Sequence, residues 1–366
     1  MLSDREDVRG RQTDQRLCDP RLLQSINAGE MPLASQPQAQ VDAARRAVHP
    51  YAALASRCAL HSVAAVELGH VEFLLCPLLG LLQPKILPGQ PRPAPALRYL
   101  VQGANGDAYA DYIRWRASTV PGAPQPNGWW FAPGAAGQQS PGLGVIDGGA
   151  GPLDLTAMEG AVRRVRSDDG GRGCVDLVVA DGVDAHAGPS GSLEKQLYAV
   201  VMSQAAVALQ VLREGGCFVF RAVEATTPLS AEILFLVQAC FEHTSIVRSF
   251  ASRPTGADRF VVCRGLVAGV KDVASHLLAA LATIRDGQFK LAHLVSWTRV
   301  SAEKDFVNMV CAANMSVAKA QITALAAVAA RAQEQHAAGD GFSGAQIDLA
   351  TRCLRLWGLP TTDTAL

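Results

Sequence analysis

The stretch from Cys174 to Leu266 constrains the fold more than any other part of the chain. Cys174–Gly182 reads CVDLVVADG and predicts a buried strand that ends at an acid, because most of its residues are apolar and its last glycine permits a sharp turn. Leu193–Gly216 predicts a helix with one apolar face that stops at a glycine pair. Cys217–Ala222 then predicts a second buried strand. The order strand, helix, strand favours an α/β fold with a parallel sheet.

The same pattern continues beyond the second strand. A Thr-Pro pair favours the start of a helix over Leu229–His243, and Asp258–Cys263 predicts the last strand. Parallel strands joined by helices place their carboxyl ends on one edge of the sheet. We therefore expect Asp181 and Arg221, which end the first two strands, to face one crevice.

The motifs DLVVADG, LREGGCFVFR, TTPLS, CFEH and SRPTGADRFVVCRGL follow one another in this stretch. Their succession resembles the FtsJ-type RNA ribose 2′-O-methyltransferases, and within them the cap-specific mRNA class. The resemblance runs from about Ala43 through RCLRLWGLP (Arg352–Pro360). It implies a Rossmann-like S-adenosylmethionine-dependent methyltransferase fold with an N-terminal helical segment and a C-terminal helical extension. It also implies S-adenosylmethionine as cofactor and RNA, namely capped mRNA, as partner.

The resembling enzymes are understood to use a Lys–Asp–Lys–Glu set to methylate the ribose hydroxyl. Asp181 falls on the aspartate of that set, Arg221 on the second lysine and Asp258 on the glutamate. Aligning HPY (His49–Tyr51) with a similar tripeptide of the family puts Val66 on the first lysine. One of the four positions is thus identical. Because arginine does not give up its proton, this pattern predicts impaired catalysis.

The cofactor loop departs from the family as well. The family pattern is a strand-end aspartate followed by an Ala-Gly-Pro-Gly-Gly type of loop, whereas this chain has QGANGDA at 102–108. Gly103, Asn105 and Gly106 remain as candidate cofactor contacts, and Asp154 is a candidate for the ribose or the adenine amine, or else a residue of a surface turn. The loss of the glycine pattern argues against tight binding of S-adenosylmethionine.

Charge and cysteine usage narrow the setting. The formal net charge is zero, from 33 basic and 33 acidic residues, so any grip on RNA requires a local basic patch. The nine cysteines form no CxxC pair, which favours free thiols in a reducing compartment and argues against a metal site. The N-terminus lacks the apolar core of a secretory signal, and no apolar run is long enough to span a membrane. We expect an intracellular protein, in the nucleus or cytoplasm.

Three segments are predicted. Residues 1–42 are polar and predict a flexible extension, 43–266 the methyltransferase-like domain, and 267–366 an alanine-rich helical extension. Within 41–82 the pattern favours a helical layer in front of the sheet, lined by Leu54, Cys58, Val63, Val66 and Leu74. Trp129 and Trp130 could stack a base, but adjacent residues of a strand point opposite ways, so at least one is expected in the core.

Three functions stay open on the sequence. The first is a degenerate relative that binds RNA or a protein partner without catalysis. The second is an active, divergent ribose 2′-O-methyltransferase whose base is Arg221, His186 in the loop after Asp181, or the phosphate of the substrate. The third is a structural scaffold subunit that touches no RNA, which the neutral charge and the alanine-rich helices also permit.

Overall fold

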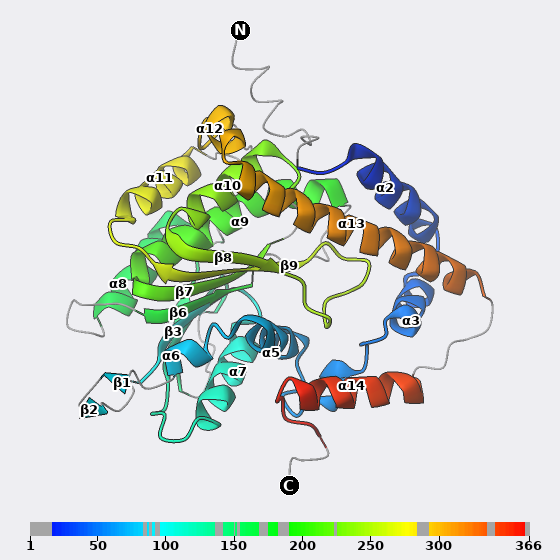
Figure 1. Cartoon of the computed structure of the whole chain (residues 1–366), viewed down its shortest axis with the longest axis horizontal. Helices are drawn as coiled ribbons and strands as arrows, with labels where there is room; N and C mark the ends of the chain where they lie inside the picture. Colours follow the sequence, from blue (N-terminus) through cyan, green and yellow to red (C-terminus); the bar gives the residue numbers. More distant parts are fainter. Residues whose placement is uncertain are drawn as a thin grey trace.

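The computed structural model describes residues 17–82, 86–87, 90–91, 96–135, 142–149, 151, 154–167, 175–181, 190–222, 225–283, 293–334 and 341–362. Its centre is a seven-stranded sheet in the order β5-β4-β3-β6-β7-β9-β8 (Figure 1). The strands are β3 (Arg98–Gln102), β4 (Asn127–Ala132), β5 (Leu143–Asp147), β6 (Val175–Ala180), β7 (Leu212–Ala222), β8 (Phe241–Val247) and β9 (Arg259–Leu266). A separate two-stranded ladder joins β1 (Ile86–Leu87) and β2 (Gln90–Pro91).

Strand direction gives the class of the fold. The pairs from β5 to β7 are parallel, and β9 runs antiparallel to β7 and β8 on either side of it. The strand order reverses between β3 and β6, which is the point where a doubly wound sheet opens a crevice at its carboxyl edge. The predicted Rossmann-like α/β fold of the methyltransferase type is confirmed.

Successive side chains of a strand point to opposite faces of the sheet, and the strands carry apolar residues on both faces. Helices therefore cover both faces. Leu100 and Trp129 pack into the core beneath α8 to α11, whereas Tyr99 and Trp130 pack into the opposite core beneath α5, α7 and α14. The helices are α4 (Leu54–Arg57), α5 (Val63–Leu75), α6 (Leu79–Leu82), α7 (Gly106–Ser118), α8 (Leu155–Ser167), α9 (Ser190–Val211), α10 (Pro228–Gln238), α11 (Lys271–Ala282), α12 (Trp297–Ala302), α13 (Lys304–Gln333) and α14 (Gly344–Leu356). Both tryptophans are buried, so neither offers a ring face for base stacking.

Two predicted helices end earlier than expected. The helix predicted to reach Gly216 ends at Val211, because Leu212 already pairs with Val175 in the sheet. The helix predicted over Leu229–His243 ends at Gln238, and the chain then forms the edge strand β8. After β9 the chain forms α11, α12, α13 and α14, in agreement with the helical extension predicted at the C-terminal side.

The prediction that residues 1–42 are a flexible extension is wrong for its second half. Residues Pro20–Ala34 form α2, capped by the Asp19 side chain, and Gln38–Val48 form α3. Both helices pack against the distal part of α13 around a third apolar core that includes Ile26, Val41 and Leu325. In Figure 1 this arm extends away from the sheet, with α13 crossing to α2 and α3. The three segment boundaries themselves stay a prediction.

The layer formed by α4 and α5 agrees only partly with its predicted lining. Leu54, Cys58 and Val66 are buried as expected, but Val63 and Leu74 are exposed. The eight cysteines in the described ranges are free thiols. In the part of the chain that the structure covers, no helix combines the length and the apolarity needed to cross a bilayer.

Candidate functional site

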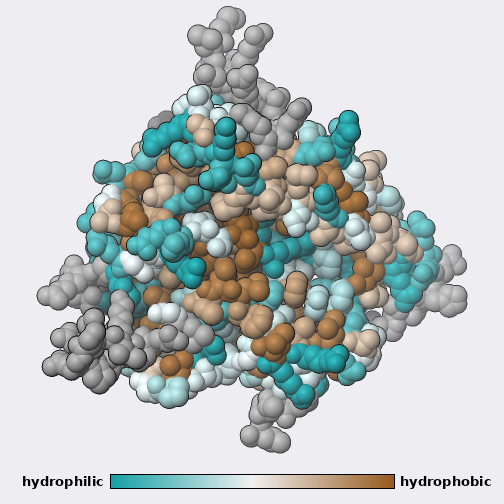
Figure 2. All heavy atoms as spheres, viewed as in Figure 1, coloured by the Kyte–Doolittle hydropathy of each residue, from teal (hydrophilic) through white to brown (hydrophobic). Residues whose placement is uncertain are grey.

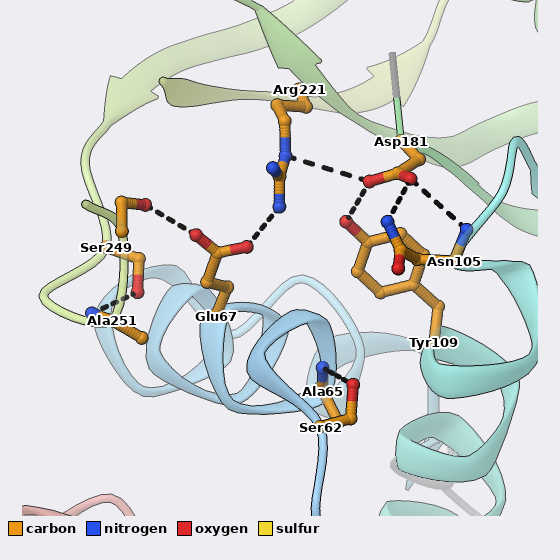
Figure 3. Close-up of polar contacts among 10 residues, drawn as sticks. Ser62, Ala65, Glu67, Asn105, Tyr109, Asp181, Arg221, Ser249 and Ala251 are labelled. Atoms are coloured by element: carbon orange, nitrogen blue, oxygen red, sulfur yellow. Dashed lines mark hydrogen bonds and ion pairs between the residues drawn. The ribbon is translucent and has the colours of Figure 1, made fainter. Parts of the chain in front are cut away.

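Asp181 and Arg221 meet at the carboxyl edge of the sheet. Asp181 follows β6 directly, and Arg221 lies at the end of the neighbouring strand β7. The two strands are parallel, and the Arg221 Nε lies 3.7 Å from the Asp181 Oδ1 (Figure 3). The prediction that they share one crevice is confirmed, whereas their chemical roles stay a prediction.

Both oxygens of Asp181 are occupied by groups from α7 and the loop before it. The Tyr109 hydroxyl donates to Oδ1 at 2.9 Å, and the backbone N–H of Asn105 donates to Oδ2 at 3.2 Å. The Asn105 side-chain amide also donates to Oδ2. Burial, followed by the charge of Asp181, raises the pKa of Tyr109 well above its usual value, so this hydroxyl stays protonated and keeps donating.

The second partner of Arg221 comes from α5. An Nη2 of Arg221 forms an ion pair with the Glu67 Oε2, and the guanidinium lies 5.5 Å from the centroid of the Phe260 ring. Burial lowers the pKa of Arg221, but Tyr109, Glu67, Asp181 and Asp258 together raise it above its usual value. This side chain therefore remains a cation.

Helix α5 contributes Glu67 to the crevice, and the alignment of Val66 with the first lysine of the family stays a prediction. Val66 is fully buried in the core beneath the sheet, and the next residue, Glu67, reaches the crevice instead. The Glu67 side chain is 97% buried and accepts a hydrogen bond from the Ser252 hydroxyl at 2.7 Å. Burial raises its pKa, against the opposing effects of Arg221 and Ser252. Sequence reasoning missed it, although a glutamate within an apolar helix is itself a sign of a buried partner.

Asp258 is the third carboxylate of the crevice. It is buried just before β9, and its Oδ1 has no hydrogen-bond partner among the described residues. It lines the same cavity as Glu67 and Arg221. One guanidinium thus faces three carboxylates, which we call the ion-pair cluster: Glu67, Asp181, Arg221 and Asp258.

Close packing explains why residues 103 and 106 of the loop are glycines. Gly103 has a φ of 103°, and a Cβ there would lie 2.8 Å from the Cβ of Asp181. A Cβ at Gly106 would lie 2.2 Å from the Trp130 ring, whose Nε1 donates to the Gly103 carbonyl at 2.8 Å. Gly103, Asn105 and Gly106 therefore pack the loop onto Asp181 and Trp130, and their cofactor role stays a prediction.

The Asp154 side chain contacts the start of α8, which lies outside the ion-pair cluster. Its Oδ1 accepts a hydrogen bond from the Ala157 backbone at 2.9 Å, which caps the start of α8. The Cβ of a residue replacing Gly149 would lie 2.1 Å from its Oδ2, so this turn is tight. The cofactor role of Asp154 stays a prediction. His186, the candidate base, lies outside the described residues.

A cavity of about 530 Å³ opens from the ion-pair cluster. Glu67, Asn105, Arg221 and Asp258 form one part of its lining. Another part is basic and aromatic, from α3, from the turn after it and from the loop before β9: Arg45, Arg46, His49, Tyr51 and Arg253. No lysine belongs to the lining as the described residues define it. Asp42, which forms an ion pair with Arg45 at 3.3 Å, belongs to the lining as well, so the cavity combines arginines with both partly exposed and buried carboxylates.

Comparison with known proteins agrees with this geometry. Residues 141–266 match the model of the FtsJ-like methyltransferase family. Cap-specific mRNA (nucleoside-2'-O-)-methyltransferase 1 from Homo sapiens is 31% identical over 227 residues, which is 60% of this chain and 26% of that protein. The Xenopus laevis protein is 29% identical over 278 residues, or 70% of this chain and 31% of that one. The chain spans about a quarter to a third of the length of these relatives.

Among solved structures, human methyltransferase-like protein 13 in complex with SAH aligns over 59% of this chain and 94% of that one, at 17% identity and a TM-score of 0.32. The fold assignment depends on the strand order described above. Residues 141–266 are thus similar to the FtsJ-like methyltransferase family, and 60% of the chain is similar to cap-specific mRNA (nucleoside-2'-O-)-methyltransferase 1.

Proposed function

We propose that this protein is an RNA-binding pseudoenzyme, which holds capped RNA in the cavity of the methyltransferase fold without methylating it. The observation that carries the proposal is the ion pair between Arg221 and Glu67 beside Asp181. A ribose hydroxyl needs a group that takes its proton as the methyl is transferred. The cation that faces Asp181 is a guanidinium whose pKa is raised further, so it offers no such group.

The cofactor loop supports the same conclusion. S-Adenosylmethionine would require the loop between β3 and α7 to offer free backbone and side-chain groups to its methionine part. The amide of Asn105 and the backbone N–H beside it already bind Asp181, and Gly103 and Gly106 are packed against Asp181 and Trp130. These contacts support the proposal that the loop does not hold the cofactor.

The cavity supports the RNA part of the proposal. Arg46 and Arg253 provide cations for phosphates, whereas Arg45 already pairs with Asp42 at 3.3 Å. Tyr51 provides a ring that a splayed base can contact. The relatives are named for methylating capped mRNA, which makes capped RNA the ligand to test. A neutral chain can bind RNA only through such a local cluster.

Three measurements on the full chain test the proposal. Calorimetry with S-adenosylmethionine should give no binding heat, and tritiated methyl transfer to a capped oligoribonucleotide should stay at background. Fluorescence anisotropy with the same oligonucleotide should show binding that weakens with salt. Arg46→Ala and Arg253→Ala should each weaken it and reduce the salt slope by about 0.7 per lost phosphate contact. Arg163→Ala on α8, outside the cavity, is the matched control.

One observation favours a second candidate, an active divergent 2′-O-methyltransferase. The Oδ1 of Asp258 is buried and has no hydrogen-bond partner among the described residues, so it is able to accept a proton in the cavity. Methyl transfer that Asp258→Asn lowers about 10²-fold or more would establish this candidate and overturn the pseudoenzyme. If the chain binds neither S-adenosylmethionine nor RNA, the third function, a structural scaffold subunit, is the one supported.

A further inference from the structure

A patch of exposed apolar side chains lies outside the cavity. Four large apolar residues gather where the end of α5, the loop after β8 and the end of α14 meet: Phe73, Leu74, Phe250 and Leu356. They are 42%, 46%, 50% and 67% exposed. Figure 2 shows hydrophobic residues at the centre of this face, where α5 lies next to β8, and again at the nearby end of α14. We call these four residues the α5–α14 patch. Exposed apolar groups that gather in this way are typical of interaction surfaces.

The base of the patch is rigid. The His70 ring, which is buried, contacts the rings of both Phe250 and Trp357, with ring centroids 4.7 and 4.3 Å away. The backbone N–H of Phe250 donates to the His70 Nδ1 at 3.3 Å. The Tyr51 ring stacks on the Phe250 ring, with the two centroids 5.0 Å apart. Phe250 is therefore held in position before any partner arrives, which reduces the entropy lost on binding.

The composition of the patch favours a protein partner over a nucleic acid. Leu74 and Leu356 have no π-face on which a base could stack, whereas mixed aromatic and aliphatic side chains are typical of the core of a protein interface. The end of a helix and a short loop form a surface suited to an amphipathic helix, which would insert apolar side chains one or two turns apart.

The charged residues around the patch indicate which charge the polar face of a partner helix should carry. Arg264 donates to the Leu75 carbonyl at 3.3 Å, which places its guanidinium beside the end of α5. Arg352 and Arg355 are exposed on α14, one turn before and directly before Leu356. Asp348 lies one turn before Arg352 and offsets part of this charge. The rim remains cationic, so it would pair with carboxylates on the partner.

We propose that the α5–α14 patch docks an acidic amphipathic helix of a partner protein. Leucine or phenylalanine residues of that helix contact Phe73, Phe250 and Leu356, and its glutamate or aspartate residues face the arginines of the rim. The proposal goes beyond RNA binding, because none of the four patch residues lines the cavity. Its test does not depend on whether the protein binds RNA or S-adenosylmethionine.

A peptide display library tests this proposal. Random peptides of about 15 residues, enough for four helical turns, are selected on the full chain and in parallel on the Phe73→Asp/Leu356→Asp variant. Met31→Asp is the matched control, because Met31 is 74% exposed on α2 and belongs to no part of the patch. Thermal unfolding of all three proteins checks that the exposed substitutions leave the fold intact.

We expect the full chain and the Met31→Asp control to enrich acidic sequences with leucine or phenylalanine at helical spacing. A synthetic copy of an enriched peptide should bind the patch variant about tenfold or more weakly, which is the loss expected when interface anchors are removed. The proposal fails if the patch variant selects the same sequences or if nothing is enriched. It also fails if the Phe73→Asp/Leu356→Asp variant, but not the Met31→Asp control, loses affinity for a capped oligoribonucleotide, because the surface would then bind nucleic acid.

Discussion

Glu67 is the residue on which the ion-pair cluster depends. Glu67→Ala would leave the buried Arg221 guanidinium without its ion-pair partner on α5 and the Ser252 hydroxyl without its acceptor. Breaking a buried ion pair by removing one partner typically costs about 3–5 kcal/mol. We expect a loss of that size in the free energy of unfolding, measured by urea denaturation.

The exposed pair Arg331–Glu334 offers the matched comparison. Its side chains are 40% and 56% exposed, and exposed ion pairs contribute about 0–1 kcal/mol, so Glu334→Ala should change the unfolding midpoint little. Equal midpoints for Glu67→Ala and Glu334→Ala would show that Glu67 is not a structural partner of Arg221. Glu67→Gln keeps an oxygen that can accept hydrogen bonds from Arg221 and Ser252, so it should lose less stability than Glu67→Ala.

His70 makes the free energy of unfolding depend on pH in the acidic range. Burial among aromatic rings lowers its pKa from 6.5 to about 4. The unfolded chain then takes up a proton between pH 6.5 and 4 while the folded chain does not, so stability is full above pH 6.5 and falls as the pH drops towards 4. A difference of this size corresponds to about 3 kcal/mol.

The non-titrating variant His70→Asn, which keeps an acceptor near the Nδ1 position, isolates this effect. Urea unfolding at pH 7 and at pH 4 should show a fall in stability about 3 kcal/mol larger for the wild type than for His70→Asn. His243→Asn, on the exposed part of β8, should behave like the wild type. Identical pH dependence of the wild type and His70→Asn would contradict the assignment.

The residues of the crevice differ in how far sequence could predict them. Asp181 and Arg221 end two recognisable strands, so topology alone brings them together. Glu67 could not be placed in this way, because α5 is buried on nearly all sides and an apolar helix without a polar face gives no sign of which residue points where. The match of HPY identified this helix and aligned Val66 with the first lysine of the family, which stays a prediction, whereas the residue that enters the site is its neighbour Glu67.

The start of α7 is an element whose position depends on one glycine. Gly106→Ala would place a Cβ 2.2 Å from the Trp130 ring, and the ring has no free space because it is buried. Overpacking of this kind typically costs about 1–3 kcal/mol, so the variant should unfold at lower urea concentration. If Gly106 serves only to admit a cofactor, Gly106→Ala should leave stability unchanged.

Gly160 in the middle of α8 is the matched control for this substitution. A Cβ there meets no atom within 4 Å, and alanine favours the helix over glycine. Gly160→Ala should therefore raise the free energy of unfolding by about 0.4–1 kcal/mol. Opposite signs at the two glycines would attribute the effect to the Trp130 contact rather than to helix propensity.

Among whole elements, buried strands and long helices followed from the sequence and the edge strand did not. The β6 and β7 segments are apolar runs bounded by turn residues, which periodicity identifies. Strand β8 reads FEHTSIV, is half-exposed and pairs with β9 alone among the described strands, so its mixed pattern resembled the end of a helix. Its extended conformation is set by pairing with β9, which a local pattern does not contain.

The two ends of the chain join the central fold into one structure. Residues 267–366 were predicted as a helical extension, yet Leu277, Val300 and Phe306 complete the core on one face of the sheet, and Leu354 and Trp357 complete the core on the other. Asn314 on α13 donates to the carbonyls of Leu17 and Ala225 at 2.9 Å each. The alanine-rich composition predicted the helices but not the surfaces that they cover.

This arrangement predicts that the fragment 43–266, the predicted methyltransferase-like domain, does not fold alone. Each large apolar side chain removed from the two cores contributes about 1.5–3 kcal/mol. Five such losses at the residues named above amount to about 7.5–15 kcal/mol, which is comparable with the about 5–15 kcal/mol that stabilises a typical domain. The fragment should show no cooperative thermal transition by circular dichroism, whereas the fragment 17–362, which keeps both ends of the described structure, should unfold cooperatively. A cooperative transition in fragment 43–266 would mean that the methyltransferase-like domain folds on its own and that its fold does not require the terminal helices.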